Sequence, residues 1–430
     1  MHQDTKKLFK HLWHLLFLKG LSRLIPLITI PWLVRTIGLE KLGVIKWVEA
    51  IADYLLVFMG YGFRYTATQQ IASYQPDKQL VGQLLGAVYT IKAVAIILAG
   101  GMLLLLMHIM PQLQALSAYL LTYYAVIVIS MLFPCFVFQG LDQMHWMTWI
   151  NLLAKLVFLA SIMLWVRTPA DALLYHLCLA LSYLLRLGIA FVWLYYGWHI
   201  RIGKPTWSMI VQQLQQGLPI FLAQLATNSY GRLPAIFLGF FVGPLSVATH
   251  VLGTKVVYTL TSMIDPFNQA LYPIASKKLS ANIQSGIRFV GRVAWIGLAV
   301  LAILGMVSWY FADAIVQLLA NQAMPEAVQV LKLYAWLPCM VLITHLMGVA
   351  ILLPLNAGYQ YTLTMLLAGM FCMVLHFLLV PLLQIPGAVW SVWLTETLAT
   401  ALLLFFAYKR IKFFMQQEVV AYPQKCKFAE

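Results

Sequence analysis

The chain alternates long apolar stretches with short polar connections, and this pattern predicts membrane-spanning helices. A helix that crosses the bilayer needs about 20 mostly apolar residues, because each residue adds about 1.5 Å. Twelve segments reach that length: 12–37, 44–65, 81–108, 117–138, 147–167, 172–198, 211–241, 245–273, 288–312, 328–353, 359–382 and 386–408. The sequence therefore predicts an all-α polytopic membrane protein with twelve transmembrane helices.

Lysine and arginine are unevenly divided between the alternate connections of these segments. Three lie in one set, Arg35, Lys41 and Arg167. Fifteen lie in the other: Lys6, Lys7, Lys10, Arg64, Lys78, Arg201, Lys204, Lys277, Lys278, Arg288, Lys409, Arg410, Lys412, Lys425 and Lys427. Because cytoplasmic loops are enriched in these residues, both termini are predicted to be cytoplasmic. The basic tail, residues 409–430, is predicted to lie in the cytoplasm or on the lipid surface.

An internal repeat appears at an offset of 205 residues. Arg35–Gly43 follows the first predicted span, and Phe240–Ala248 occupies the equivalent place in the second half, so that Gly38 corresponds to Gly243. In each half, a glycine-marked turn joins two spans and a longer polar connection follows. This spacing predicts two pseudo-symmetric six-helix lobes, residues 1–205 and 206–408.

The composition excludes a soluble domain, since 62% of the 430 residues are apolar and only 10% are charged. The formal net charge is +15. The basic residues are spread along the chain, so no nucleic-acid partner is expected. The five cysteines show no C-x-x-C spacing, and they are interpreted as free, small apolar residues.

No enzyme motif is present: the chain lacks G-x-S-x-G, the P-loop, H-E-x-x-H and G-x-G-x-x-G. The longest predicted external connection, residues 312–327, carries only two acidic residues, which leaves little room for catalysis outside the bilayer. The histidines lack metal-ligand spacing. The sequence therefore predicts a protein that is not an enzyme and that holds neither a metal nor a cofactor.

Eleven ionisable residues inside the predicted spans are candidate site residues. The cations are Arg23, Lys46, Lys92, Lys155, Arg186, Arg232 and Lys255, and the acids are Glu49, Asp53, Asp265 and Glu396. Each charge at the bilayer centre costs roughly 2.5–3.5 kcal/mol on insertion scales. Seven cations and four acids leave three positive charges without an acidic counterpart. We therefore expect a hydrated cationic cavity that receives an anionic substrate.

The cations are the candidate substrate-binding residues. Arg23, Arg232 and Lys255 are the strongest candidates, because they lie in the first or second span of a half, where prolines interrupt the helices. Guanidinium groups bind phosphate through paired hydrogen bonds, and lysine supplies a mobile charge, so the set suits a phosphate-bearing ligand. Simple anion binding is the alternative. For the other three candidates, structural pairing competes with cavity lining: Lys92, Lys155 and Arg186.

Candidate ion-coupling or ion-pair residues form a second group. Lys46, Glu49 and Asp53 have the spacing i, i+3 and i+7, which predicts an ion-pair ladder on one helix face. A structural ladder and a coupling site both fit this spacing. Two further acids are candidates for titration during transport, namely Asp265 and Glu396. Asp265 precedes a proline, so it also fits the cap of a broken helix.

Three consecutive motifs resemble the N-terminal signature of bacterial polysaccharide-export flippases of the Wzx type. The motifs are Leu27–Gly43, Ala50–Tyr54 and Gly60–Ala72, all within residues 27–72. Pro31, Arg35, Gly38 and Gly43 match the family pattern. Gln69 and Gln70 stand where an arginine is common in the family, which departs from the pattern at a predicted cytoplasmic contact.

The resemblance implies the multidrug/oligosaccharidyl-lipid/polysaccharide (MOP) superfamily, with two six-helix lobes around a cavity that alternates its access. The implied substrate is a sugar repeat unit on an isoprenoid pyrophosphate. The implied location is the bacterial inner membrane. Membrane lipids are expected partners, a polysaccharide polymerase and a chain-length regulator are candidate partners, and the protein is expected to be a monomer.

Three alternatives are weighed against this interpretation. A multidrug or small-molecule exporter of the same superfamily would need an acid-dominated cavity, whereas this chain has a surplus of cations. A membrane-embedded polymerase or ligase would need a large external catalytic loop. A lipid-linked peptidoglycan precursor flippase usually carries two further C-terminal spans, whereas the tail here is polar.

Overall fold

The computed structural model describes residues 2–74 and 77–426, and side chains are described for these except 2–24, 219, 223, 225–230, 265–266, 269–270 and 417–426. This part of the chain forms helices and no strands. The helices are α1 (His2–Gly60), α2 (Phe63–Tyr74), α3 (Lys78–Ile109), α4 (Pro111–Ala115), α5 (Ser117–Leu132), α6 (Cys135–Gly140), α7 (Met144–Trp165), η1 (Pro169–Leu173), α8 (Leu174–Val192), η2 (Trp193–Gly197), α9 (Trp207–Phe241), α10 (Pro244–Thr261), α11 (Ile264–Ala281), α12 (Ile283–Tyr310), α13 (Ala312–Ala320), α14 (Pro325–Tyr334), α15 (Leu337–His345), η3 (Leu346–Leu352) and α16 (Gly358–Cys426).

The apolar segments of the sequence fall on these helices, and the all-helical class is confirmed. Seven helices among the described residues are long and apolar enough to cross a membrane. The total of twelve membrane-spanning helices stays a prediction. Some spans are interrupted: the segment 245–273 is divided where α10 ends at Thr261 and α11 begins at Ile264. In the segment 117–138, α5 ends just before Pro134, which has no backbone donor to continue the helix.

The two glycines of the internal repeat both adopt backbone angles that favour glycine. Gly38 has φ +80° and ψ 168° and breaks α1 into two helices. Gly243 has φ +122° and separates α9 from α10. A side chain at such angles is strained, because Cβ clashes with the backbone. The structure thus has a glycine turn at both positions, and the equivalence of the two halves stays a prediction.

A stability prediction follows from the turn at Gly38. We expect Gly38→Ala to lower the free energy of unfolding by about 1–3 kcal/mol, since the mirror-image extended region is essentially restricted to glycine. Gly101→Ala in α3 is the matched control, because a Cβ there meets no atom within 4 Å. Denaturation in detergent measures both variants. Equal stability of the two variants would show that the turn does not need glycine.

Contacts divide the chain into two compact units. The first comprises Met1–Thr249 and Leu319–Asn321, and the second comprises His250–Leu318 and Gln322–Glu430. These units are defined by contacts, whereas the two predicted six-helix lobes are defined by the number of membrane-spanning segments in each half. The predicted lobe boundary between residues 205 and 206 therefore stays a prediction. Each unit is described below by itself.

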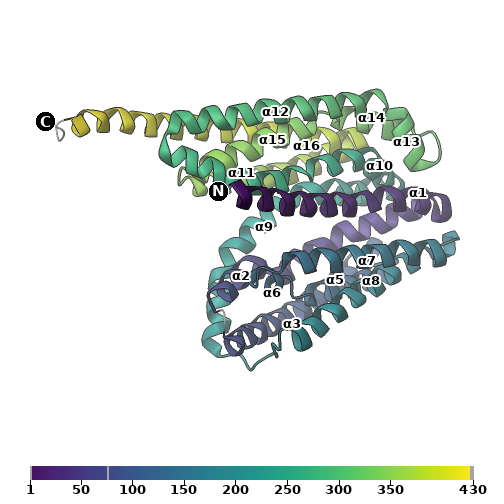
Figure 1. The fold of residues 1–430 in the computed structure, drawn as a ribbon. Helices are drawn as coiled ribbons and strands as arrows, with labels where there is room; N and C mark the ends of the chain where they lie inside the picture. Colours follow the sequence, from purple (N-terminus) through teal and green to yellow (C-terminus); the bar gives the residue numbers. More distant parts are fainter. Residues whose placement is uncertain (1, 75–76, 427–430) are drawn as a thin grey trace. The chain divides into compact units, whose positions relative to one another are not determined.

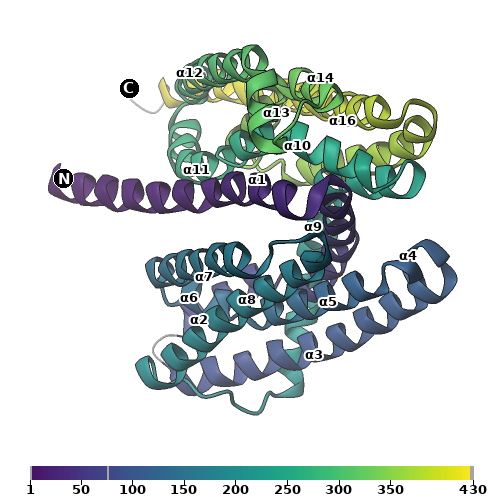
Figure 2. The same cartoon turned by 90° about the vertical axis from the view of Figure 1, so that its right-hand side faces the viewer.

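In the first unit, α1 packs against α3, α5, α7 and α9, and α8 packs against both α5 and α7 (Figures 1 and 2). The interior of this bundle is apolar: Val48, Leu55 and Met59 of α1 meet Leu103 of α3 and Val126 of α5. In the second unit, α12 packs against α11, α14, α15 and α16 (Figure 1). The part of α1 that follows Gly38 therefore shares its core with segments that are distant in the sequence.

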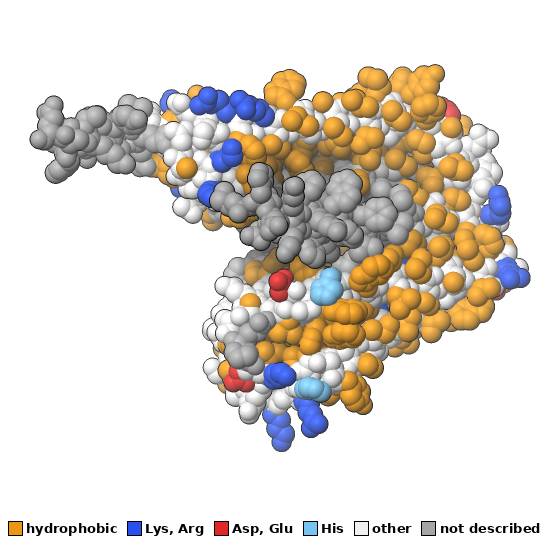
Figure 3. Space-filling view, viewed as in Figure 1, with side chains coloured by type: hydrophobic (Ala, Val, Ile, Leu, Met, Phe, Trp, Pro, Cys, Tyr) orange, Lys and Arg blue, Asp and Glu red, His pale blue; other side chains and the backbone are white. Residues whose placement is uncertain are grey.

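Apolar side chains also cover the outer flanks of the helices (Figure 3). Ile97 of α3 and Trp295 of α12 are 74% and 77% exposed. In water such exposure is unfavourable, whereas lipid chains solvate it. The exposed flanks agree with a protein that is surrounded by lipid.

Contacts between the connecting segments agree with the predicted pairing of membrane faces. The amide of Gly203 donates to the carbonyl of Gly82 at 2.9 Å, so the Arg201–Lys204 connection lies against the start of α3. Trp32 Nε1 donates to the carbonyl of Val166 at 3.1 Å, which joins two segments assigned to the opposite face. Which of the two faces is cytoplasmic stays a prediction.

Candidate functional site

A polar cluster lies inside the helix bundle of the first unit, on the second half of α1. Its centre is the predicted ladder of Lys46, Glu49 and Asp53. Lys46 and Glu49 form an ion pair at 2.6 Å, and their side chains are only 17% and 15% exposed. The predicted pairing of these two residues is confirmed. Asp53 does not continue the ladder, because its carboxylate is bound by side chains from other helices.

Asp53 is held from two sides. The hydroxyl of Tyr123 in α5 donates to Asp53 Oδ1 at 2.9 Å, and Arg232 of α9 forms an ion pair with Oδ2. The Asp53 side chain is 9% exposed, whereas that of Arg232 is 44% exposed. The carboxylate is therefore buried in the first unit, whereas the Arg232 side chain keeps a large accessible surface.

Lys46 and Glu49 are also connected to α8. Lys46 Nζ donates to the Tyr175 hydroxyl at 3.1 Å and lies 5.1 Å from the centre of that ring. Together with Glu49, Tyr175 thereby fixes the ammonium group between α1 and α8. A charge pair that is buried and hydrogen-bonded in this way contributes to the choice of one helix packing.

His176 completes the cluster and was not among the candidate site residues. Its ring is fully buried and packs against the rings of Tyr119, Tyr123 and Tyr175 at centroid distances of 6.2, 5.0 and 5.5 Å. Nδ1 lies 3.4 Å from the Thr122 hydroxyl, and Nε2 has no hydrogen-bond partner among the described residues. No sequence spacing could have signalled this contact, because α5 and α8 meet α1 only through tertiary packing.

Arg186 and Lys92 lie elsewhere in the first unit, apart from the ladder. Arg186 donates to the Ser130 hydroxyl at 3.1 Å and to Asn151 Oδ1 at 3.3 Å, and its guanidinium stacks 4.4 Å from the Tyr183 ring centre. Lys92 is 4% exposed and donates to the carbonyl of Met131 at 2.6 Å. Both cations are thus engaged by neutral groups, and in the described part of the chain no ion pair joins either of them to an acid.

Three further candidates lie on other helices. Lys155 in α7, Lys255 in α10 and Glu396 in α16 are half-buried. Lys255 and Glu396 belong to the second unit. The side chains of Arg23 and Asp265 lie outside the described residues, so the roles of these two residues stay predictions. Among the described residues, no three histidine, cysteine or acidic side chains gather as metal ligands.

The glutamine that replaces the family arginine connects α2 to α9. Gln213 Nε2 donates to Gln70 Oε1 at 2.6 Å, and Gln70 Nε2 donates to Gln216 Oε1 at 2.9 Å. The Thr66 hydroxyl donates to Gln213 Oε1 at 3.0 Å. At this position α2 and α9 are joined by hydrogen bonds between neutral side chains, whereas an arginine would place a charge there.

Comparison with known families and proteins agrees with the motif resemblance. The sequence profile described as "Polysaccharide biosynthesis protein" matches residues 8–279, more than half of the chain. A protein of Escherichia coli (strain K12) named "Putative O-antigen transporter" is 27% identical over 414 residues, which are 94% of this chain and 98% of that protein. A protein of Shigella dysenteriae with the same name is 23% identical over 279 residues, 62% of this chain and 67% of that protein.

Solved structures show which fold the helices form. The lipid II flippase MurJ in an inward closed conformation has a TM-score of 0.73 at 11% identity, covering 92% of this chain and 88% of that one. An inward-facing multidrug resistance transporter of the MATE family and MOP superfamily has a TM-score of 0.70 at 13% identity, covering 92% and 99%. The chain therefore has the fold of MOP transporters, and at such low identity the likeness says nothing about the substrate.

Proposed function

Because the chain belongs to the family of polysaccharide biosynthesis proteins, we propose that it is a flippase for an oligosaccharide repeat unit linked to an isoprenoid pyrophosphate. The repeat unit moves from the cytoplasmic to the outer leaflet of the bacterial inner membrane. The relatives named as O-antigen transporters support this class of cargo. Their names also favour a transporter over an enzyme.

The observation that carries the proposal is the exposed side chain of Arg232 beside the buried carboxylate of Asp53. Arginine binds phosphate through paired hydrogen bonds, and 44% of this side chain is accessible in the first unit. A pyrophosphate that binds Arg232 competes with Asp53 for the same guanidinium. Asp53 then keeps its hydrogen bond from Tyr123, so the carboxylate is not left without a partner when the substrate arrives.

The full proposal has a cationic cavity lined by Arg23, Lys92, Lys155, Arg186, Arg232 and Lys255. Twelve spans in two six-helix lobes alternate the access of this cavity to the two sides of the membrane. Lys46, Glu49, Asp53, Asp265 and Glu396 are the proposed ion-coupling or ion-pair residues. Both termini are proposed to be cytoplasmic, following the bias of lysine and arginine in the connections.

Transport in proteoliposomes tests this function. The purified protein is reconstituted with a short isoprenyl-pyrophosphate oligosaccharide in one leaflet, and its appearance in the other leaflet is measured against protein-free vesicles. We expect translocation that depends on the protein. A parallel arm measures uptake of a small organic cation. No translocation of several oligosaccharides, together with uptake of the cation, would replace the flippase with an exporter of the same superfamily.

A further inference from the structure

The hairpin of α11 and α12 in the second unit presents two matching helical stripes. On α11 the stripe runs through Ile264, Phe267, Ile274 and Lys278, at spacings that keep one face of the helix. On α12 it runs through Ser285, Phe289, Val293, Ile296, Val300 and Leu304. The two helices pack against each other and are joined at Asn282. The stripes therefore border one groove along the hairpin.

The end of the groove next to Asn282 is basic. A cavity of about 570 Å³ there is lined by Pro273, Ile274, Lys277, Lys278, Ala281 and Ser285. Arg288 and Arg292 follow on α12, and residues 267–310 contain no aspartate or glutamate. Four cations without an acid in the same segment attract an anion that carries more than one negative charge.

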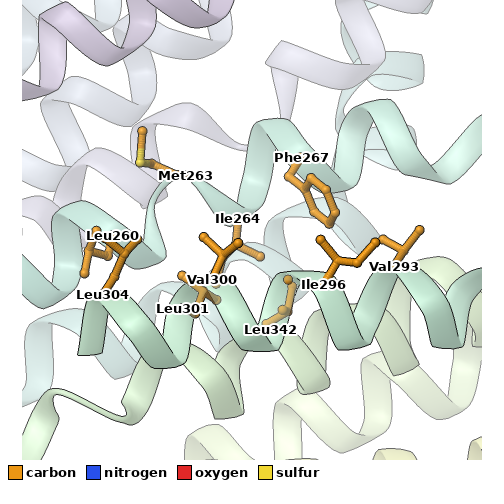
Figure 4. Close-up of a pocket in the computed structure, with 11 residues that line it drawn as sticks. Leu260, Met263, Ile264, Phe267, Val293, Ile296, Val300, Leu301, Leu304 and Leu342 are labelled. Carbon is orange, nitrogen blue, oxygen red and sulfur yellow. The ribbon is translucent and has the colours of Figure 1, made fainter. Parts of the chain in front are cut away.

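The other end of the groove is apolar. A cavity of about 440 Å³ opens between the end of α10, the start of α11 and the middle of α12, with Leu342 of α15 behind it. Figure 4 shows Phe267 and Ile264 on one side and Val293, Ile296 and Val300 on the other, with carbon side chains pointing into the space. Its volume lies within the range of small-molecule sites, about 300–1,000 Å³.

The two ends are connected through Lys278 and Phe289. Lys278 Nζ lies 4.5 Å from the centre of the Phe289 ring, and Phe289 lies on α12 between Ser285 of the basic cavity and Val293 of the apolar one. From Phe267 to Lys277 the helix rises by roughly 15 Å at 1.5 Å per residue. The hairpin thus offers a charged head site and an apolar tail site along one line.

We propose that this groove binds the isoprenoid pyrophosphate part of the substrate where it enters from the cytoplasmic leaflet, before the pyrophosphate passes to Arg232. The pyrophosphate then lies on Lys277 and Lys278, and the first part of the isoprenoid chain lies in the apolar cavity. The inference rests on the proposed function. Charge complementarity favours this occupant over a membrane phospholipid, because a pyrophosphate carries more negative charge than a single phosphodiester. Exposed apolar side chains beside the cavity let the rest of the chain continue into the bilayer.

A photoreactive farnesyl diphosphate tests the site in the full-length protein in vesicles. The benzophenone stands at the end of the farnesyl chain, and labelled peptides are mapped after irradiation. We expect label on residues 260–304, removed by unlabelled farnesyl diphosphate but not by equal amounts of farnesol or phosphatidylglycerol. The double variant K277Q/K278Q should lower the labelling at least fivefold. The control R201Q/K204Q removes two charges from another predicted cytoplasmic connection and should leave it unchanged.

The apolar end has its own matched pair of variants. Val300→Trp fills the cavity and should reduce the labelling, whereas Ile303→Trp on the same helix is exposed to a similar degree, 63% against 51%, and does not line the cavity. If added phosphatidylglycerol removes the labelling, the groove binds a phospholipid and the inference is overturned. Label elsewhere in the chain, with oligosaccharide translocation intact, would overturn it and leave the flippase standing. Absent translocation in the wild-type protein would instead count against the function itself.

Discussion

Arg232→Ala is expected to reduce translocation of the lipid-linked oligosaccharide at least tenfold. Hydrogen bonds to a charged group contribute about 1.5–3 kcal/mol, and each 1.4 kcal/mol corresponds to a factor of ten. The Arg232 side chain is 44% exposed beside Asp53, so its removal takes away a phosphate-binding group and leaves the carboxylate with the hydrogen bond from Tyr123. Arg232→Lys should retain part of the activity, because lysine keeps the charge but loses the paired geometry.

The measurement is the initial rate of translocation in proteoliposomes, at equal amounts of folded protein judged by gel filtration. Arg167→Ala is the matched control, since this exposed arginine lies on a predicted outer connection. A second arm, the double variant R232A/D53A, separates binding from structure. If the double variant regains wild-type transport, Arg232 serves only to neutralise Asp53. Wild-type transport by Arg232→Ala itself would contradict the phosphate-binding role.

Glu49→Ala is expected to have the largest effect on stability, a loss of about 3–5 kcal/mol. Removal of one partner of a buried ion pair leaves the other charge without compensation. Lys46 would keep only the Tyr175 hydroxyl as an acceptor. The double variant Lys46→Met with Glu49→Leu should recover most of this loss, because an apolar pair of similar volume removes both buried charges.

Thermal unfolding of the detergent-solubilised protein measures these variants, with the exposed pair of Lys332 and Asp313 as control. That pair has a distance of 3.1 Å, and the Asp313 side chain is 76% exposed, so Asp313→Ala should change stability by less than about 1 kcal/mol. A Glu49→Ala protein as stable as the wild type would mean that water reaches Lys46. In that case the pair belongs to a hydrated cavity and is not a structural element.

Much of the architecture follows from local patterns in the sequence. The apolar segments give the helices, because a run of about 20 apolar residues has no other stable state in lipid. Gly38 and Gly243 give the two turns, because few other residues adopt positive φ. The pair of Lys46 and Glu49 follows from their spacing of three residues on one helix. The residues that resemble the family signature lie close together in the sequence, so the class of transporter could be predicted without knowledge of the fold.

The partners of these local features depend on packing between distant segments. Asp53 meets Tyr123 and Arg232, which are 70 and 179 positions away, and His176 reaches the same cluster from α8. The groove of α11 and α12 likewise needs the register of two antiparallel helices, which decides that Lys278 lies over Phe289. Hydropathy reports how each residue partitions between water and lipid. It does not say which of the several cations in the spans pairs with Asp53, because the shapes of the packed helices decide that Arg232 is the partner.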